Sequence, residues 1–392
     1  MINAKIPPNP PLKKGEIGEE FNDQYYMARA LRLAKRGLWS TDPNPRTGCV
    51  IVHDGEIVGE GWHQVAGEPH AEIHALSMAK EKAAGATCYV TLEPCCHYGR
   101  TPPCTDALIK AGITRIVAAM TDPNPLVSKK GIEQLRKAGI TVNTGVLSQE
   151  AEQLNPGFFM RMRHNRPYIR CKLAMSLDGR TAMPSGESKW ITSQEARRDV
   201  QCLRARSSAI MTGAGTVLAD DPQLTVREEE LPCQLHTDKL PVIKQPLRVV
   251  VDTHLSMPPE ARLLSLPGET VIFTASYNKT IKAMLEKTGA RVISQPNHEK
   301  QVDLQALCHI LSEEYEVNEL QMEVGQNLSG AMLRAGLIDE LVIYIAPMLM
   351  GNKARGLFNR PDIEHLNQHV PLSIVDIRAI GQDWRVTAYP NY

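Results

Sequence analysis

The chain has 392 residues, and its 44 Lys and Arg are balanced by 44 Asp and Glu, so its formal net charge is zero. This length exceeds what a single hydrophobic core organises efficiently and predicts two domains. Lys and Arg do not cluster with interleaved aromatic residues, which argues against the basic stripe of a nucleic-acid binder. The composition therefore favours small polar molecules as partners and disfavours nucleic acid.

The number and distribution of the cysteines and the length of the apolar stretches indicate the cellular compartment of the protein. The nine cysteines are odd in number and scattered outside one cluster, and no basic segment followed by an apolar one is found at the N-terminus. This usage predicts a reducing compartment. The longest apolar stretch, 341–350, is interrupted by Pro347 and is too short to span a bilayer. We therefore expect a cytoplasmic protein that does not associate with membranes.

The first half of the chain predicts a three-layer α/β/α domain. Residues 1–20 are rich in proline and lack apolar periodicity, which predicts a mobile arm. Helical and strand patterns then alternate, as expected for helices on both faces of a sheet. The expected helices are 24–36, 70–84, 105–111 and 131–138, and the expected strands are 48–52, 57–61, 87–92, 114–119 and 140–146.

The second half predicts another α/β domain. The basic stretch 155–167 looks irregular, so we place the boundary there and expect domains at 21–156 and 157–392. A helix is expected from Thr192, with Glu195 completing a capping box. Further helices are expected at 281–288, 304–315 and 328–335, and strands at 168–175, 209–212, 247–251, 270–273, 291–293, 320–323 and 340–345.

Two short segments carry the signature of a metal site. His70-Ala71-Glu72 is followed, about 25 residues later, by the cysteine-rich run 94–104. Zinc-dependent nucleobase deaminases use one imidazole, two thiolates and a separate proton-carrying glutamate in this order. We assign His70, Cys95 and Cys104 as ligands of one Zn²⁺, which would lower the pKa of a bound water towards about 7. Glu72 would take the proton of that water and return it to the ring nitrogen and the departing ammonia.

The spacing of the cysteines leaves alternatives open. Eight residues separate Cys95 from Cys104, whereas deaminases usually have Pro-Cys-x-x-Cys. Cys96 or His97 could in principle be a ligand instead, but Cys104 is preferred because it opens a helical run. A structural zinc site or inert thiols would leave the upstream His-x-Glu pattern unexplained.

The same region resembles the deaminase domain of the bifunctional riboflavin-biosynthesis deaminase/reductase. The resemblance rests on residues 43–45, 48–50, 61–72, 92–95, 99–104 and 122–125. It implies a cytidine-deaminase-like fold and a substrate in which a diaminopyrimidinone is joined to ribose 5-phosphate. It also implies that Asn44 and His63 line the base and ribose, and that Arg100, Asp122 and Asn124 bind the ribose-phosphate end.

Some of these residues can be explained without a role in substrate binding. The chain also departs from the family pattern at several positions. Asn44 and Asn124 sit in Asn-Pro turns, where Asn is common for backbone reasons. Cys96 and Thr47 stand where the family often has Ser and Val. Lys129 stands where it often has Gly, which puts the shape of that loop in doubt.

Glycines in the second half predict a phosphate-binding site. Gly213 and Gly215 follow a strand, where they would let a phosphorylated ligand approach the backbone, and Thr216 adds a hydroxyl donor. Gly325 lies between a strand and a helix and offers a second anion site at a helix N-terminus. Two such segments suit a dinucleotide.

Residues 157–360 resemble the reductase domain of the same bifunctional family. The resemblance runs from 172–179 and 186–192 through 212–216, 219–222 and 224–227 to 323–325 and 339–341. It implies a dihydrofolate-reductase-like α/β fold, NADPH as cofactor and hydride transfer that converts a ribosyl group into ribityl. The implied NADPH residues are Lys172, Trp190, Gly213, Gly215, Thr216, Asp220, Thr253 and Gly325, and the implied substrate residues are Ser188, Arg204, Leu224, Arg227 and Glu323.

Several points about this second site stay open. Asp220 and Glu323 are the nearest acids to the site, but neither receives a proton-transfer role. Arg204 could instead lie on a solvated helix face, and Trp190 could be a core residue. Gln326 stands where the family often has Pro, which bears on the fit of a pyrophosphate.

The sequence therefore predicts a bifunctional enzyme of riboflavin synthesis that acts on pyrimidine ribotides and forms a homo-oligomer, either a dimer or a tetramer. It would deaminate 2,5-diamino-6-(ribosylamino)-4(3H)-pyrimidinone 5′-phosphate and then reduce 5-amino-6-(5-phosphoribosylamino)uracil. One alternative keeps the deaminase and makes the second domain an inactive scaffold. Another is a nucleic-acid-editing deaminase, which the neutral charge disfavours.

Overall fold

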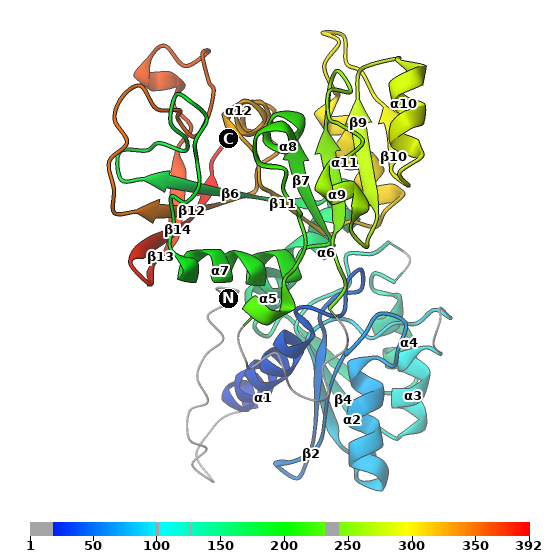
Figure 1. Ribbon diagram of the computed structural model, residues 1–392. Helices are drawn as coiled ribbons and strands as arrows, with labels where there is room; N and C mark the ends of the chain where they lie inside the picture. Colours follow the sequence, from blue (N-terminus) through cyan, green and yellow to red (C-terminus); the bar gives the residue numbers. More distant parts are fainter. Residues whose placement is uncertain (1–18, 99–101, 126, 232–242) are drawn as a thin grey trace. The chain divides into compact units, whose positions relative to one another are not determined.

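The computed structural model describes residues 19–98, 102–125, 127–231 and 243–392. The chain divides into two compact units, residues 1–164 and residues 165–392, which run from blue to green and from green to red in Figure 1. Most of the predicted N-terminal arm lies outside the described residues. Its last two residues, Glu19 and Glu20, begin helix α1.

The first unit is built on a five-stranded sheet in the order β2-β1-β3-β4-β5. Strand β1 pairs antiparallel with β2 and β3, and β3, β4 and β5 are parallel. The strands are β1 (Gly48–His53), β2 (Glu56–Trp62), β3 (Thr87–Val90), β4 (Arg115–Ala118) and β5 (Thr141–Thr144). The carboxyl ends of β3 and β4 therefore lie at the same edge, where the segments that follow them meet.

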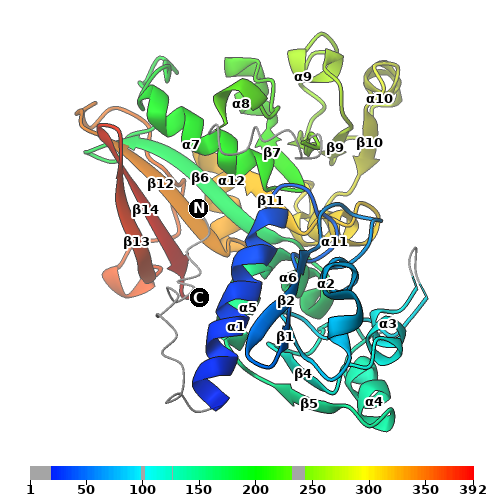
Figure 2. The same ribbon diagram turned by 90° about the horizontal axis from the view of Figure 1, so that it is seen from below.

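Helices cover both faces of this sheet, which confirms the predicted three-layer α/β/α fold. One face packs on α1 (Glu19–Ala34) and α5 (Ser148–Leu154), and the other on α2 (Ala71–Ala79), α3 (Cys104–Lys110) and α4 (Lys130–Lys137). Figure 2 shows α1 on one side of the strands and α2, α3 and α4 on the other. Successive residues of β1 serve opposite faces: Cys49 and Ile51 face one core, Val50 and Val52 the other.

Glycines on β1 and β2 let the helices approach closely. A Cβ on Gly48 would lie 2.0 Å from the carbonyl oxygen of Ala30 in α1. Cβ atoms on Gly59 and Gly61 would each lie 2.2 Å from a carbonyl oxygen in α2. The position of α2, which begins beside His70 and carries Glu72, therefore depends on the absence of side chains at these glycines.

The segment 155–167, predicted to be irregular, contains a helix, so that prediction is wrong. Helix α6 (Pro156–His164) starts with Pro, which suits a first helical position because it has no N–H to satisfy. Its Phe158 and Phe159 are buried against Leu92 of the first unit. Asn155 exchanges two hydrogen bonds with the backbone of Arg46, of 2.7 and 2.9 Å. The division between the units falls at 164/165 rather than 156/157 because these contacts hold the segment to the first unit.

The second unit contains a nine-stranded sheet in the order β10-β9-β8-β7-β11-β6-β12-β14-β13. All neighbours from β10 to β12 are parallel, and β14 pairs antiparallel with β12 and β13. The strands are β6 (Tyr168–Ser176), β7 (Ala209–Gly213), β8 (Leu247–Val251), β9 (Thr270–Thr274), β10 (Arg291–Ser294), β11 (Glu319–Met322), β12 (Glu340–Ala346), β13 (Leu372–Ile380) and β14 (Asp383–Pro390). The hairpin β13–β14 was not predicted.

Helices also pack on both faces of the larger sheet. Helices α11 (Leu304–Glu313) and α12 (Gln326–Arg334) share one core with β6, β7 and β11. The opposite face is covered by α7 (Gln194–Ala205), α8 (Ala214–Asp220), α9 (Arg262–Ser265) and α10 (Lys279–Glu286). Helix α7 is capped by Ser193, whose hydroxyl accepts the N–H of Ala196, so the cap predicted at Thr192 is one residue early. Within the described residues, no helix is both long and apolar enough to cross a membrane.

We predict that Gly61→Ala lowers the stability of the first unit by about 1–3 kcal/mol, since overpacking at a close contact costs this much. The added methyl group would push α2 away from β2 and disturb Glu72. Urea unfolding measures the first effect, and the rate of the deamination expected from the sequence measures the second. Gly356→Ala is the control, because no atom lies within 4 Å of a Cβ there. Equal unfolding midpoints for the two variants would contradict the packing argument.

Candidate active sites

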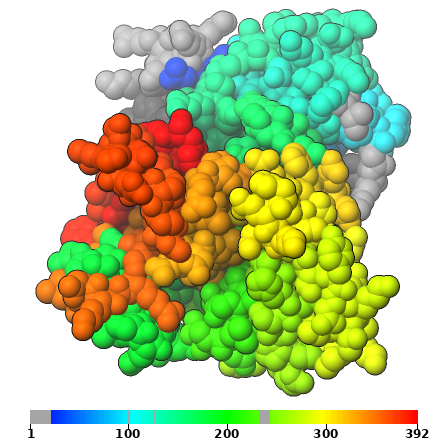
Figure 3. All heavy atoms as spheres, turned by 90° about the horizontal axis from the view of Figure 1, so that it is seen from above, coloured from blue at the N-terminus to red at the C-terminus, as the bar shows by residue number. Residues whose placement is uncertain are grey.

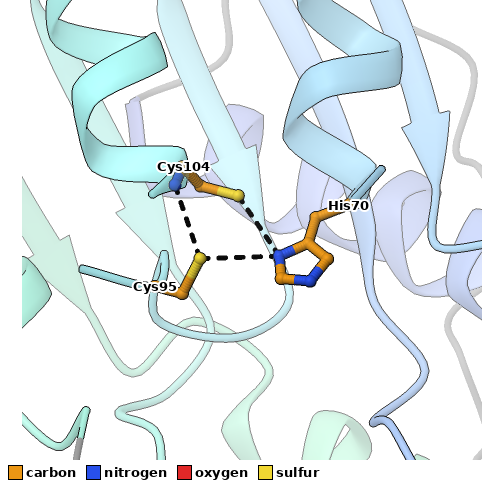
Figure 4. A group of neighbouring side chains, drawn as sticks. All are labelled: His70, Cys95 and Cys104. Carbon is orange, nitrogen blue, oxygen red and sulfur yellow. Dashed lines mark hydrogen bonds between the residues drawn. The ribbon is translucent and has the colours of Figure 1, made fainter. Parts of the chain in front are cut away.

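The first unit brings His70, Cys95 and Cys104 together into a potential metal site. The Nδ1 atom of His70 lies 3.5 Å from the sulfur of Cys95 and 3.3 Å from that of Cys104 (Figure 4). The three ligand atoms lie within 4.8 Å of one another. Two thiols and one imidazole are a donor set that suits tetrahedral Zn²⁺ and leave a fourth position for water.

Two helix starts and the segment that follows β3 position these groups. His70 is the N-cap of α2, and Cys104 is the first residue of α3. The backbone N–H of Cys104 donates to the sulfur of Cys95 (3.4 Å), and the N–H of Thr105 donates to the Cys95 carbonyl (3.2 Å). The N-terminal end of a helix favours a thiolate over a thiol. Hydrogen bonds from Cys104 and His70 lower the pKa of Cys95 to about 4, although burial opposes this.

Glu72 lies on the first turn of α2 and is only 4% exposed. Burial raises the pKa of its carboxyl, and the neighbouring His70 lowers it. A buried carboxyl two residues after a ligand is suitably placed for proton transfer at the metal.

Cys96 and His97 do not join the metal group. Among the residues that the structure describes, the only cluster able to hold a metal is His70, Cys95 and Cys104. Cys96 is partly buried, and burial raises the pKa of its thiol. The geometry thus favours Cys104 over the two alternatives that the spacing left open.

Asn44 and His63 lie next to the metal group. The His63 ring is 5.2 Å from that of His70, centroid to centroid. Its Nδ1–H donates to the Pro69 carbonyl (3.2 Å), and its Nε2 accepts from the side-chain amide of Asn44 (3.1 Å). Burial lowers the pKa of His63 to about 4, so the ring is neutral at physiological pH.

Asp122 and Asn124 lie in the segment that follows β4. Asp122 is buried, and burial raises the pKa of its carboxyl to about 7. Its Oδ1 accepts the backbone N–H of Asn124 (2.8 Å), so these two predicted substrate residues form one turn. Arg100, the third predicted residue of this group, lies outside the described residues.

Sequence reasoning did not single out Glu93, although the structure gives it an unusual environment. Its carboxylate is 3% exposed and accepts four backbone N–H groups. A signal existed in the sequence: a charged residue stands between a buried strand and Pro94, which precedes the candidate ligand Cys95, where an apolar residue would otherwise be expected.

The second unit contains one large cleft of about 1840 Å³ that collects every residue predicted for the reductase site. It lies where the carboxyl ends of β6, β7, β8 and β11 meet. Figure 3 shows a hollowed surface between green and orange segments of this unit. The cleft is lined by Lys172, Ser188, Trp190, Arg204, Gly213, Gly215, Thr216, Asp220, Leu224, Arg227, Thr253, Glu323 and Gly325.

The glycines of this cleft start helices. Gly213 is the N-cap of α8, with Gly215 and Thr216 inside that helix, and Gly325 is the N-cap of α12. A Cβ on Gly325 would lie 4.0 Å from Thr216 Oγ1, so the two helix starts are close together. A Cβ would find no atom within 4 Å at Gly215 and only ordinary contacts at Gly213. Since packing does not require these glycines, the free space beside them fits a bound dinucleotide phosphate.

Arg204 and Glu323 form a largely buried ion pair inside the cleft. Arg204 donates two hydrogen bonds to the Glu323 carboxylate, of 2.7 and 2.8 Å, and a third to the Thr225 carbonyl (2.8 Å). Burial opposes ionisation of Glu323, but Arg204 and Lys172 lower its pKa to about 2. Arg204 is 13% exposed, so it does not lie on a solvated helix face.

The other residues of the cleft differ in exposure. Trp190 is 68% exposed, which rules out core packing, and the Arg197 guanidinium lies 4.6 Å from its ring centroid. Lys189 contacts Asp220 through that residue's carbonyl oxygen (3.1 Å). Lys172 is partly exposed to the cleft, and burial lowers the pKa of its ammonium group. Leu224 is buried and holds a left-handed backbone with φ of 52°.

The folds and sites define a class: an enzyme with a zinc-dependent deaminase unit and a separate nucleotide-dependent reductase unit. Residues 21–120 match the cytidine and deoxycytidylate deaminase zinc-binding region, and residues 167–386 match the RibD C-terminal domain. The riboflavin biosynthesis protein RibD of Escherichia coli strain K12 is 54% identical over 364 residues, covering 92% of this chain and 97% of its own. The Haemophilus influenzae RibD is 46% identical over 375 residues, covering 95% of this chain and 99% of its own.

Solved structures agree over the whole chain. Acinetobacter baumannii RibD, form 1, has a TM-score of 0.87 at 45% identity, covering 95% of this chain and all of its own. The diaminohydroxyphosphoribosylaminopyrimidine deaminase/5-amino-6-(5-phosphoribosylamino)uracil reductase of Thermotoga maritima has a TM-score of 0.81 at 30% identity, with the same coverage. The chain belongs to the RibD family. It is a bifunctional deaminase and reductase of riboflavin biosynthesis, with Zn²⁺ and NADPH as its cofactors.

Replacing the cysteines one at a time should show whether Cys104 or Cys96 is the metal ligand. We expect Cys104→Ala to remove most of the bound zinc because it leaves only two protein ligands. Cys96→Ala should retain zinc close to one per chain. Metal analysis of the purified variants measures this, with the reductase rate as a control for folding. The reverse order of zinc contents would move the ligand to Cys96.

The Arg204–Glu323 pair predicts a pH-dependent stability. The pKa of Glu323 is about 2 in the folded chain and 4.5 without its partners, so its stabilisation is present above about pH 4.5 and is lost as pH falls towards 2. Glu323→Gln should lower the urea midpoint at pH 7, and the difference from the wild type should shrink between pH 5 and pH 3. Replacing the exposed Glu260 by Gln is the control. A difference independent of pH would contradict the ion pair.

Proposed function

We propose that the first unit deaminates 2,5-diamino-6-(ribosylamino)-4(3H)-pyrimidinone 5′-phosphate and that the second reduces the ribosyl group of 5-amino-6-(5-phosphoribosylamino)uracil to ribityl. The proposal rests chiefly on the convergence of His70, Cys95 and Cys104 beside the buried Glu72. The name of the Thermotoga maritima relative supports the two substrates. The assignment of deamination to the unit 1–164 and of reduction to the unit 165–392, and the roles of individual residues, are part of the same proposal.

In the deaminase unit, His70 Nδ1 and the sulfur atoms of Cys95 and Cys104 would hold Zn²⁺. When bound, the metal supplies the Lewis acid that makes water a nucleophile near neutral pH. Glu72 takes one proton from the attacking water and gives it to the ring nitrogen, then takes the remaining proton of the hydroxyl added to the ring carbon and gives it to the amine, which departs as ammonia. The burial of Glu72 keeps bulk water from competing for this proton.

Asn44 and His63 would form one polar edge of the pyrimidine and ribose site. Their mutual hydrogen bond fixes the imidazole, and it leaves one amide N–H and the amide oxygen of Asn44 for the substrate. Asp122 and Asn124, joined in one turn, would hold ribose hydroxyls, and Arg100 would bind the phosphate.

In the reductase unit, the helix starts at Gly213 and Gly325 would receive the phosphates of NADPH, with Thr216 as a hydroxyl donor. When bound, the nicotinamide supplies the hydride to the sugar C1. The other proposed cofactor contacts are Lys172, Trp190, Gly215, Asp220 and Thr253, and the proposed substrate contacts are Ser188, Arg204, Leu224, Arg227 and Glu323. Because the Glu323 carboxylate is ionised, we give it the role of hydrogen-bond acceptor and not of proton donor.

The lining of the cleft argues against the alternative in which the second unit is an inactive scaffold. All of its predicted residues line one space, and the paired charges of Arg204 and Glu323 lie inside that space. Burying two charges carries a desolvation cost, and a scaffold without a ligand gains nothing in this space that would offset it.

We also propose a cytoplasmic homo-oligomer. The eight described cysteines are free thiols, which supports a reducing compartment. Strand β13 forms an edge of the nine-stranded sheet and exposes Ile374 (59%) and Ile377 (57%). An exposed apolar edge strand can pair with the same strand of a second copy about a two-fold axis, which supports a dimer.

The deaminase assignment predicts a selective loss in Glu72→Gln. The amide cannot carry the proton, so ammonia release should fall by at least about 100-fold, the contribution expected of general acid–base catalysis. Zinc content and NADPH-dependent reduction of the deaminated ribotide should remain near wild-type values. Ammonia release at the wild-type rate by this variant would contradict the assignment of Glu72.

The reductase assignment predicts that a side chain at Gly213 blocks the cofactor. Gly213→Val should raise the KM for NADPH about tenfold or more, because a β-branched side chain would occupy the space proposed for a phosphate. Deamination should be unchanged. Gly356→Val is the matched control, since its Cβ would meet no atom within 4 Å. An unchanged KM in Gly213→Val would refute the role of this helix start.

A further inference from the structure

Glu93 lies between the end of β3 and the zinc ligand Cys95, and both of its carboxylate oxygens are used inside the protein. Oε2 accepts the backbone N–H groups of Asp122 (3.1 Å) and Lys129 (2.9 Å). Oε1 accepts those of Gly131 (3.0 Å) and Ile132 (3.2 Å). With 3% of its surface exposed, this side chain is an internal anchor and not a surface charge.

The N–H groups of Gly131 and Ile132 belong to the first turn of α4, and those of Asp122 and Lys129 belong to the segment that links β4 to α4. This segment carries Asp122, and the Asp122 carboxylate in turn accepts the N–H of Asn124 (2.8 Å). The backbone N–H of Glu93 itself donates to the carbonyl of Met120, near the start of the segment (3.0 Å). Glu93 therefore ties the zinc-ligand segment to both ends of the proposed ribose-binding segment.

The backbone of this segment adopts a conformation that needs such an anchor. Lys129 has a left-handed backbone with φ of 65°, which a residue with a side chain adopts only at a cost. Gly131 passes so close to the ligand segment that a Cβ would lie 2.2 Å from the Pro94 carbonyl oxygen. Gly131 and Ile132 lie in the first turn of α4, whose N–H groups have no partner within the helix. The Glu93 carboxylate satisfies them where a water molecule has no access.

We propose that Glu93 is a positioning residue of the deaminase, which holds Asp122 and Asn124 at a fixed place relative to the metal and thereby sets the affinity for the ribose-phosphate part of the substrate. This inference rests on the proposed deamination of the ribotide. It assigns Glu93 no contact with the substrate, the metal or the reacting atoms.

The test measures deamination kinetics, zinc content and reductase rate in Glu93→Gln and Glu93→Ala. We expect the KM for the diaminopyrimidinone ribotide to rise about tenfold in Glu93→Gln, the lower end of what removal of a supporting hydrogen bond costs, and further in Glu93→Ala. The kcat should change less than the KM, and both zinc and the reductase rate should be retained. The control is Glu133→Gln. Glu133 has an exposed carboxyl on α4, and this variant should behave as the wild type.

A double variant separates positioning from general destabilisation. Asp122→Asn should raise the KM strongly in the wild-type background and only weakly in Glu93→Gln, because Asp122 is already displaced there. Additive effects, an unchanged KM in Glu93→Gln, or loss of zinc with an unchanged KM would each overturn the inference. If Glu93→Ala does not fold, the KM of Glu93→Gln still tests the inference, because the Gln side chain keeps one acceptor oxygen. Failure of the wild type to deaminate the ribotide would contradict the proposed function and not the role of Glu93.

Discussion

Helix N-termini that meet the ends of strands are the constraint on which both sites depend. The first turn of a helix leaves N–H groups without partners and carries a partial positive charge, so it attracts thiolates, carboxylates and phosphates. His70 caps α2 and Cys104 opens α3, and Gly213 and Gly325 cap α8 and α12. In the proposed function, the same physical feature would serve a metal in one unit and a dinucleotide in the other.

The sheets decide where these helix starts lie. In the first unit, β3 and β4 are parallel, so the segments after them meet at one edge, and the Glu93 carboxylate joins these segments there. In the second unit, β6, β7, β8 and β11 are parallel neighbours whose following segments surround the cleft. Glycines set the distances: Gly61 lets α2 approach β2, and Gly131 lets the first turn of α4 approach Pro94.

The sequence predicted much of this architecture because its strongest signals are local. Alternating strand and helix patterns predicted the three-layer fold of the first unit. The order of His70, Cys95 and Cys104, with Cys104 opening a helical run, predicted the group that the structure brings together. The predictions failed where a tertiary contact overrode composition. The basic segment around Arg161 forms α6 because Phe158 and Phe159 find a buried partner in Leu92. No helix was predicted directly after the strand 209–212, yet Gly213 caps α8 and Gly215 lies inside that helix.

Other features could not be predicted because they depend on contacts between distant residues. The role of Glu93 appears only when residues about 30 to 40 positions apart come together around one carboxylate. The Arg204–Glu323 pair joins α7 to the end of β11 across 119 residues of sequence. Lys129, an apparent departure from the family pattern, occupies a left-handed position, which explains why glycine is common there.

The most direct test of the account is a single reaction that contains the purified protein, Zn²⁺, NADPH and the diaminopyrimidinone ribotide, in which ammonia release and NADPH oxidation are followed together. The account predicts that ammonia appears first and that an equal amount of NADPH is then oxidised. Ammonia release without NADPH oxidation would contradict the assignment of the cleft as a reductase site. Oxidation without ammonia release would contradict the assignment of the zinc site.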